Sequence, residues 1–152
     1  MVLLYLVQHG QAKSEREDPE RPLTDQGTDE VARVAHQAVE VAGARPARVV
    51  HSGKTRARQT AEVWAGLLSV GVEEADGLSP NDDPQTWAAR LGPSSDDLLL
   101  VGHLPHLGRL TSLLVIGSPD APLVGFRPGG LVGLDQVETG WMIWVVMPPE
   151  AI

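Results

Sequence analysis

Apolar residues follow two alternating patterns along the chain. Runs rich in apolar residues occur at 2–7, 48–51 and 97–101. Such runs are typical of strands that are covered on both faces, as in a parallel sheet. A shorter run at 72–75 predicts another strand, and the segments 131–134 and 141–147, joined by a polar turn, predict a final hairpin.

Between these runs, apolar residues recur every three or four positions, as they do on one face of a helix. The first such face contains Val31, Ala35, Ala38 and Ala42, the second Ala57, Ala61, Trp64 and Leu68, and the last Leu107, Leu110 and Leu114. Thr24 is placed to cap the first helix and Gly43 to end it. A shorter helix is predicted over 84–91 with Asp83 as its cap, and Pro105 is well placed to start the last one.

Strands that alternate with helices in this way predict an α/β fold. The expected architecture is a three-layer sandwich, in which helices flank a mostly parallel central sheet and antiparallel strands lie at one edge. With 152 residues and a mass of 16.2 kDa, the chain has the size of one ordinary domain. Residues 1–152 are therefore predicted to form a single domain.

The composition narrows the functional classes. The chain has no cysteine, which excludes disulfides, thiolate metal sites and a cysteine nucleophile. A formal net charge of −8 argues against general binding to nucleic acid or to anionic membranes. The apolar start at 1–7 is short and has no basic leader, so it is interpreted as a strand and not as a signal peptide, and a cytoplasmic location is expected. Any site for an anion must be locally positive.

Polar residues follow three of the predicted strands. His9 and His103 each lie beside a glycine at the end of an apolar run, and the segment from His51 leads to Arg56. In open α/β sheets, ligands bind beyond the carboxyl ends of the strands. A single histidine at such a position is often structural, but two that are flanked by glycine favour function, because glycine lets the backbone approach a bound group closely.

Four segments resemble, in order, the motifs of the histidine phosphatase (phosphoglycerate mutase-like) superfamily. They are residues 8–10 (QHG), 21–24 (RPLT), 52–61 (SGKTRARQTA) and 102–105 (GHLP). Within that superfamily, the chain is most similar to the small bacterial phosphohistidine phosphatases of the SixA type. The resemblance extends from Val2 to about Leu114.

The resemblance implies a role for each matching residue. His9 would attack phosphorus and carry the phosphoryl group as a phosphohistidine, and His103 would face it and donate to the transferring oxygens. The residues implied to bind phosphate are Gln8, Arg21, Arg56, His103 and Leu104. A neutral imidazole is a good nucleophile near pH 7, and guanidinium groups suit phosphate oxygens. Neither a metal nor a cofactor is expected.

One position departs from the family pattern. The family motif has an arginine where this chain has Gln8, which brings no charge and cannot form a bidentate fork. Three outcomes stay open: activity that survives a loss of roughly 10²- to 10³-fold in rate, a weakly active or inactive phosphate-binding or regulatory protein, or compensation by a charged His51. The alternative for His51 is packing beneath the loop without contact to a ligand.

A general acid is not clearly identified by the sequence. Asp82 is an accessory candidate, whereas Asp83 is better explained as a helix cap. A missing acid matters most for alkoxide leaving groups, so the chemistry favours phosphohistidine over alkyl phosphate esters. The expected partner is a phosphorylated protein, as in bacterial signalling, or a small phosphorylated substrate. Trp141 and Trp144 fit either the core or a dimer interface, and the oligomeric state stays open.

Overall fold

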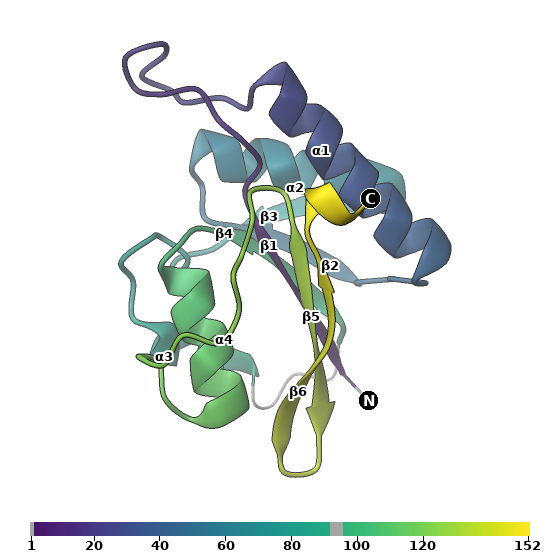
Figure 1. Ribbon diagram of the computed structural model, residues 1–152, viewed down its shortest axis with the longest axis vertical. Helices are drawn as coiled ribbons and strands as arrows, with labels where there is room; N and C mark the ends of the chain where they lie inside the picture. The colour runs from purple at the N-terminus through teal and green to yellow at the C-terminus, as the bar shows by residue number, and fades with distance from the viewer. Residues whose placement is uncertain (1, 92–95) are drawn as a thin grey trace.

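The computed structural model describes residues 2–91 and 96–152, and it contains one central sheet (Figure 1). Met1, which opens the predicted apolar run, lies outside the described residues. The strands are β1 (Leu3–Gln8), β2 (Arg48–His51), β3 (Val72–Glu74), β4 (Leu98–Gly102), β5 (Leu131–Val137) and β6 (Gly140–Met147). Their spatial order is β3-β2-β4-β1-β5-β6.

The pairing of the strands confirms the predicted fold class. β3, β2, β4 and β1 are parallel neighbours, whereas β5 pairs antiparallel with β1 and with β6. The antiparallel hairpin therefore forms one edge of the sheet. In the β1–β4 pair, Gln8 lies opposite Gly102. Because these are the last residues of two adjacent parallel strands, His9 and His103 leave the sheet side by side.

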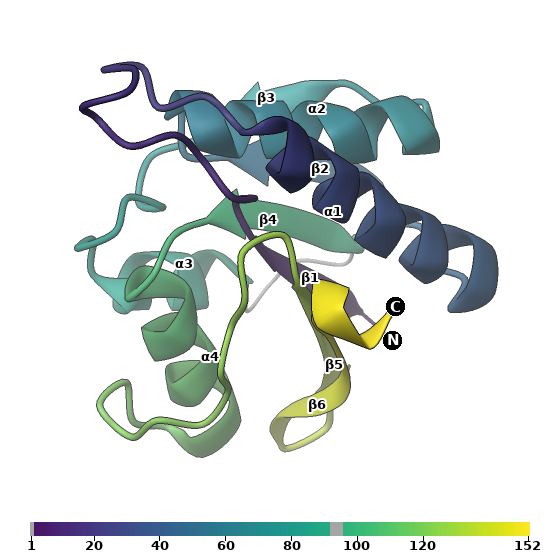
Figure 2. The same cartoon turned by 45° about the horizontal axis from the view of Figure 1, so that its top comes forward.

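Helices cover both faces of the sheet, which gives the predicted three layers. They are α1 (Asp25–His36), α2 (Thr55–Leu68), α3 (Pro84–Leu91) and α4 (His106–Ile116), and a short 3-10 turn, Pro149–Ala151, lies near the end of the chain. Figure 2 shows α1 and α2 on one side of the sheet and α3 and α4 on the other. The continuous apolar run of β1 explains this, since its alternate residues face the two helical layers.

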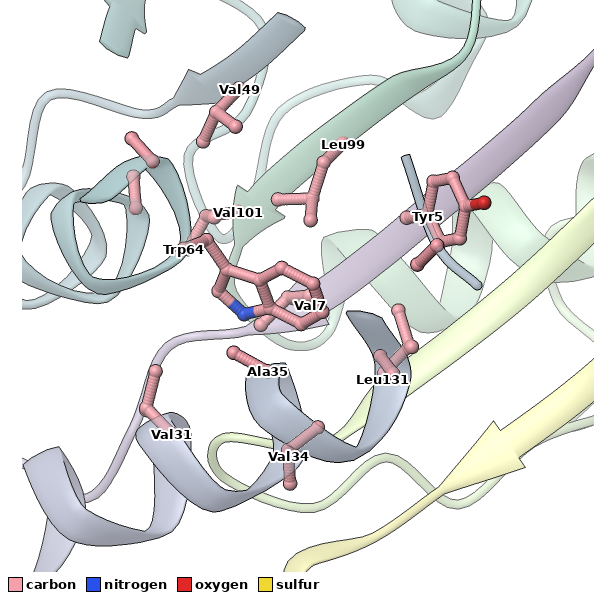
Figure 3. Close-up of a cluster of buried hydrophobic side chains, with 14 of the residues drawn as sticks. Tyr5, Val7, Val31, Val34, Ala35, Val49, Trp64, Leu99, Val101 and Leu131 are labelled. Atoms are coloured by element: carbon pink, nitrogen blue, oxygen red, sulfur yellow. The ribbon is translucent and has the colours of Figure 1, made fainter. Parts of the chain in front are cut away.

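Two buried clusters, one on each face, hold the layers together. On the α1 and α2 side, the fully buried Trp64 of α2 packs with Val7 of β1 and Ala35 of α1 (Figure 3). On the other side, Leu4 and Leu6 of β1 belong to the cluster that includes the apolar residues of α3 and α4. These clusters fix β1 and β4, and hence the positions of the residues that follow them.

The first helix differs from its predicted form near its end. After α1, residues Gln37–Val41 form a π-helical turn, in which the N–H of Ala42 donates to the carbonyl of Gln37. This wider turn contains more residues than an α-helical turn, so the buried face shifts. Val39 is buried and Ala42 is exposed, which corrects the prediction that Ala42 belongs to the apolar face.

The two tryptophans of β6 have different surroundings. Trp141 is buried in the core, whereas Trp144 is 39% exposed and lies edge-on to Tyr5, with a ring-centroid distance of 6.3 Å. The pairing of β5 with β6 shifts between Gly133 and Leu134, which leaves Trp144 as the extra residue of a bulge. Gly133 gives room to its ring, because a Cβ there would lie 2.5 Å from Nε1 of Trp144. Of the two alternatives given for Trp141, its burial supports a place in the core.

None of the helices in residues 2–91 and 96–152 is long and apolar enough to cross a membrane.

Candidate active site

His9 and His103 face one another beyond the ends of β1 and β4. Their ring centroids are 5.0 Å apart and the ring planes are inclined by 49°. His103 is buried, and His9 is partly open to solvent. The structure thus brings together the two histidines that the sequence placed at separate strand ends.

The protonation of His9 follows from its surroundings. Its Nδ1 lies 2.8 Å from the carbonyl oxygen of Gly10, and because a carbonyl only accepts, Nδ1 carries the proton. Burial is the main cause that lowers the pKa of His9 to about 4; the Gly10 hydrogen bond opposes this, and the charges of Arg56 and Arg21 add to it. At neutral pH the ring is therefore neutral, with the lone pair on Nε2.

The backbone around His9 is anchored to the sheet and to α2. The N–H of His9 donates to the carbonyl of Gly102 over 3.0 Å, and the N–H of Gly10 donates to Oγ1 of Thr60 over 3.0 Å. Thr60 in turn donates to the carbonyl of Arg56 over 2.8 Å. Position 10 has no space for a side chain, because a Cβ would lie 2.7 Å from Cγ2 of Val31. These contacts fix His9 relative to Arg56.

His103 is held from the neighbouring strand. Its Nε2 shares a hydrogen bond of 2.7 Å with Oγ of Ser52, which follows β2. Burial chiefly lowers the pKa of His103 to about 3, and His9 in its protonated form, Arg56, Lys54 and protonated His106 add to this in that order. Ser52 was not predicted as a site residue, although it opens the third of the motif segments.

Two arginines give this site its positive charge. Arg56 is the second residue of α2, and its Nε is buried without a hydrogen-bond partner among the described residues. Burial lowers the pKa of Arg56, and so does the nearby charge of Arg21. Arg21 adopts φ +49°, a left-handed conformation that is uncommon for a residue with a side chain, and its Nε donates to the carbonyl of Lys13 over 3.1 Å. The strained backbone is consistent with a functional constraint on Arg21.

The site is thus locally positive in an acidic protein. Arg21 and Arg56 both act on His9, and the first turn of α2 adds the positive end of a helix dipole. The arrangement can bind an anion through its oxygen atoms, next to the neutral imidazole of His9. Among the described residues, no cluster of three or more His, Asp or Glu side chains is suited to a metal ion.

Gln8 and Leu104 lie at the edges of this site. Gln8 is 9% exposed, and its Oε1 has no hydrogen-bond partner among the described residues. Its carbonyl accepts from the N–H of Gly129, which also reaches the carbonyl of His9. The exposed Leu104 side chain is among those that line a groove of about 310 Å³ between α4 and residues 119–124. Their roles in phosphate binding stay predictions.

The two accessory candidates are engaged elsewhere. His51 is buried, its Nδ1 accepts from the N–H of Gly53 over 3.0 Å, and burial lowers its pKa. This arrangement fits the packing alternative, because a neutral ring adds no charge to the site. An oxygen of Asp82 accepts from the N–H of Ser79 over 2.9 Å, and Asp83 accepts from the N–H of Gln85 at the start of α3.

His106, the first residue of α4, was not singled out by the sequence. Its side chain is completely buried, and neither ring nitrogen has a hydrogen-bond partner among the described residues. Burial lowers its pKa. The helical spacing of apolar residues did not reveal this position, because histidine is not an apolar residue.

Comparison with known proteins places these features in a wider group. Residues 4–80 match a sequence model of the histidine phosphatase superfamily (branch 1). None of the curated proteins matches the chain. The chain is similar to the protein histidine phosphatase SixA complexed with tungstate, with 26% identity, a TM-score of 0.84 and 98% of each chain covered.

Two further solved structures are similar. A protein assigned as the phosphohistidine phosphatase SixA of Nakamurella multipartitia is 25% identical, with a TM-score of 0.69 over 96% of this chain and 95% of that one. The α-ribazole phosphatase from Shigella flexneri is 14% identical, with a TM-score of 0.78 over 97% of this chain and 96% of the other. The latter identity indicates a shared fold alone. Phosphatases of different substrates therefore share this architecture.

Proposed function

This chain belongs to the histidine phosphatase superfamily (branch 1), and from that premise we propose that it is a phosphatase that removes phosphate from phosphohistidine in a protein substrate. His9 carries the phosphoryl group during the reaction. The observation that carries the proposal is the Nδ1 hydrogen bond of His9 to the Gly10 carbonyl, which leaves Nε2 as the nucleophilic atom of a ring that faces the ring of His103.

The reaction has two displacements. In the first, Nε2 of His9 attacks phosphorus, the N–P bond forms, and the bond to the leaving group breaks. In the second, water attacks phosphorus and loses a proton to solvent, the N–P bond to His9 breaks, and inorganic phosphate leaves while Nε2 recovers its lone pair. Because the pKa of His9 is lowered to about 4, the nucleophile is unprotonated throughout the neutral range.

The positive residues stabilise the charge on the transferring oxygens. Arg21 and Arg56 bind these oxygens together with the N-terminus of α2. His103, which is neutral at neutral pH, adds a hydrogen-bond donor and no charge. Phosphoryl transfer depends mainly on such positioning and electrostatic stabilisation. In this proposal the reaction needs no metal ion.

The leaving group indicates the substrate class. The candidate general acid, Asp82, is engaged by the N–H of Ser79 over 2.9 Å. An alkoxide requires a strong general acid, whereas an imidazole that is protonated on its other nitrogen leaves with less help. This supports phosphohistidine, and the similarity to a protein histidine phosphatase supports a protein-borne substrate.

The runner-up is a weakly active or inactive phosphate-binding or regulatory protein on the same scaffold. The observation that favours it is Gln8, whose neutral side chain stands where the family motif has an arginine and whose Oε1 is buried without a partner among the described residues. In this alternative, the pocket binds phosphate but hydrolyses phosphorylated substrates slowly or not at all.

A comparison of the wild type with His9→Ala tests the proposal. A histidine-phosphorylated protein is the substrate, and His36→Ala, at an exposed position of α1, is the matched control. We expect His9→Ala to lose roughly 10³-fold or more in kcat/KM, and an alkaline quench, in which phosphohistidine is stable, to trap phosphate on wild-type His9 alone. Equal low activity of wild type and His9→Ala would overturn the phosphatase reading in favour of the binding protein. Faster hydrolysis of phosphoserine would reject the substrate class.

A further inference from the structure

We propose that Lys54 contributes a third positive charge to the phosphate pocket and so replaces the charge that Gln8 does not provide. The inference rests on the proposed function, because it concerns how the same pocket holds phosphoryl oxygens. It names a residue of the third motif segment to which the resemblance assigns no role.

The backbone places Lys54 at the end of α2 that faces the site. Its conformation is extended, with φ −72° and ψ 144°, and its carbonyl accepts from the N–H groups of Ala57 and Arg58 in the first turn. Lys54 is thus the cap residue of the helix whose second residue is Arg56. Its side chain departs from the positive end of the helix dipole, where an anion is favoured.

Ser52 links Lys54 directly to His103. The N–H of Lys54 donates to Oγ of Ser52 over 3.4 Å, and the same oxygen is 2.7 Å from Nε2 of His103. The positive charge of Lys54 also lowers the pKa of His103. The hydrogen bond places the backbone of Lys54 beside the ring that faces His9, and the effect on the pKa shows that its charge acts on that ring.

No ion pair involves Lys54 within residues 2–91 and 96–152. Arg58, which lies four residues later, differs in this respect, because its guanidinium pairs with Glu62 over 3.2 Å. A cation without a partner at the entrance of an anion site is free to bind the ligand.

The order of the strands explains how Lys54 can replace an arginine of β1. β4 lies between β2 and β1, so His103 at the end of β4 has Gln8 on one side and the Ser52 segment on the other. A charge absent from the β1 side can therefore be supplied from the β2 side. Lysine acts on phosphate as a point charge on a flexible stem, which suits an approach from a different direction.

A double-mutant cycle tests this compensation. The four proteins are the wild type, Lys54→Gln, Gln8→Arg and the double variant, and kcat/KM is measured for a histidine-phosphorylated protein. We expect Lys54→Gln to lose about 10²-fold in kcat/KM in the wild-type background, and clearly less when Gln8→Arg is present, since the two charges substitute for one another. Equal losses in both backgrounds would overturn the proposal, and so would no loss at all.

A second measurement avoids the buried position of Gln8, where an arginine can prevent folding. The dissociation constant of inorganic phosphate is compared for wild type, Lys54→Gln and Lys54→Arg, with Arg58→Gln as a control that removes the same charge farther along α2. We expect Lys54→Gln alone to weaken binding, by about tenfold or more. Phosphate affinity that is unchanged in Lys54→Gln, or equally weak in Lys54→Arg, would overturn the role of the charge. If Lys54→Gln is fully active while His9→Ala is inactive, the proposed function stands and the role of Lys54 is rejected.

Discussion

Oγ of Ser52 lies 2.7 Å from Nε2 of His103 and connects the segment after β2 to the residue that follows β4. His9 has a similar attachment, because its Nδ1 donates to the carbonyl of Gly10. Each of the two facing rings therefore has one nitrogen held by the protein. This fixes the orientation of both imidazoles before a ligand binds, which reduces the reorganisation that a charged transition state would require.

Removal of the Ser52 hydroxyl should disturb His103 without unfolding the protein. Ser52→Ala deletes the hydrogen bond with His103 and the longer one from the N–H of Lys54. The bond with His103 contributes about 1 to 1.5 kcal/mol, so we expect kcat/KM to fall roughly tenfold. Steady-state kinetics with a histidine-phosphorylated protein provide the measurement. Ser52→Thr keeps the hydroxyl and serves as the control. A rate of Ser52→Ala equal to that of the wild type would show that His103 needs no support from Ser52.

Thr60 should matter for both stability and activity. Thr60→Val keeps the shape of the side chain but leaves the buried N–H of Gly10 without its acceptor. We expect a loss of about 1 to 3 kcal/mol in the free energy of unfolding, measured with urea, and a lower kcat/KM because the segment of His9 shifts. Thr28→Val makes the same chemical change at an exposed position of α1 and is the matched control. Unchanged stability of Thr60→Val would contradict the anchoring role.

Two glycines in helices should respond in opposite directions to alanine. In α1, a Cβ at Gly27 would lie 2.2 Å from the carbonyl oxygen of Gln11, so Gly27→Ala must separate the helix from the segment that follows His9. In α2, Gly66 has open space around its Cβ position. We expect Gly66→Ala to stabilise the protein by about 0.5 to 1 kcal/mol, and Gly27→Ala to destabilise it by about 1 to 3 kcal/mol. Urea denaturation measures the free energy of unfolding of both variants. A stabilised Gly27→Ala would contradict the close packing of α1 against Gln11.

The sequence predicted the layers of the fold because its signals there are local. The apolar runs at β1, β2 and β4 and the helical spacing around Trp64 depend on residues that are close in the chain. The π-helical turn after α1 was not predicted, since the same apolar spacing fits an α-helix that reaches Ala42. Backbone hydrogen bonds decide whether this turn is π-helical or α-helical, and these bonds leave no signal in the sequence.

The candidate site was predicted only in part, for a related reason. His9 and His103 are visible because glycines flank both at the ends of strands. Ser52 meets His103 across 51 positions of the chain, and Thr60 meets Gly10 across 50, so neither partner can be found from spacing alone. Their roles depend on the order of the strands, which the sequence did not determine.

Three buried histidines and the partly buried His9 make the stability of the protein dependent on pH. Burial is the main cause that lowers the pKa values of His9, His51, His103 and His106 below the ordinary value of 6.5. Below about pH 6.5, the unfolded chain therefore binds protons that the folded protein does not bind. The stabilisation is complete above pH 6.5 and is lost as the pH falls towards the folded-state values, about 4 for His9 and about 3 for His103.

His106 allows this dependence to be tested away from the facing pair of histidines. Its ring is fully buried; Asp82 and Asp83 raise its pKa, Arg109 lowers it, and burial outweighs them. His106→Leu removes the titrating group, so the loss of stability between pH 6.5 and 4.5 should become shallower, by up to about 1.4 kcal/mol per pH unit. Urea denaturation across this range measures the slope, with His36→Leu as the matched change at an exposed histidine. An unaltered slope in His106→Leu would mean that His106 binds its proton equally well in the folded and unfolded states.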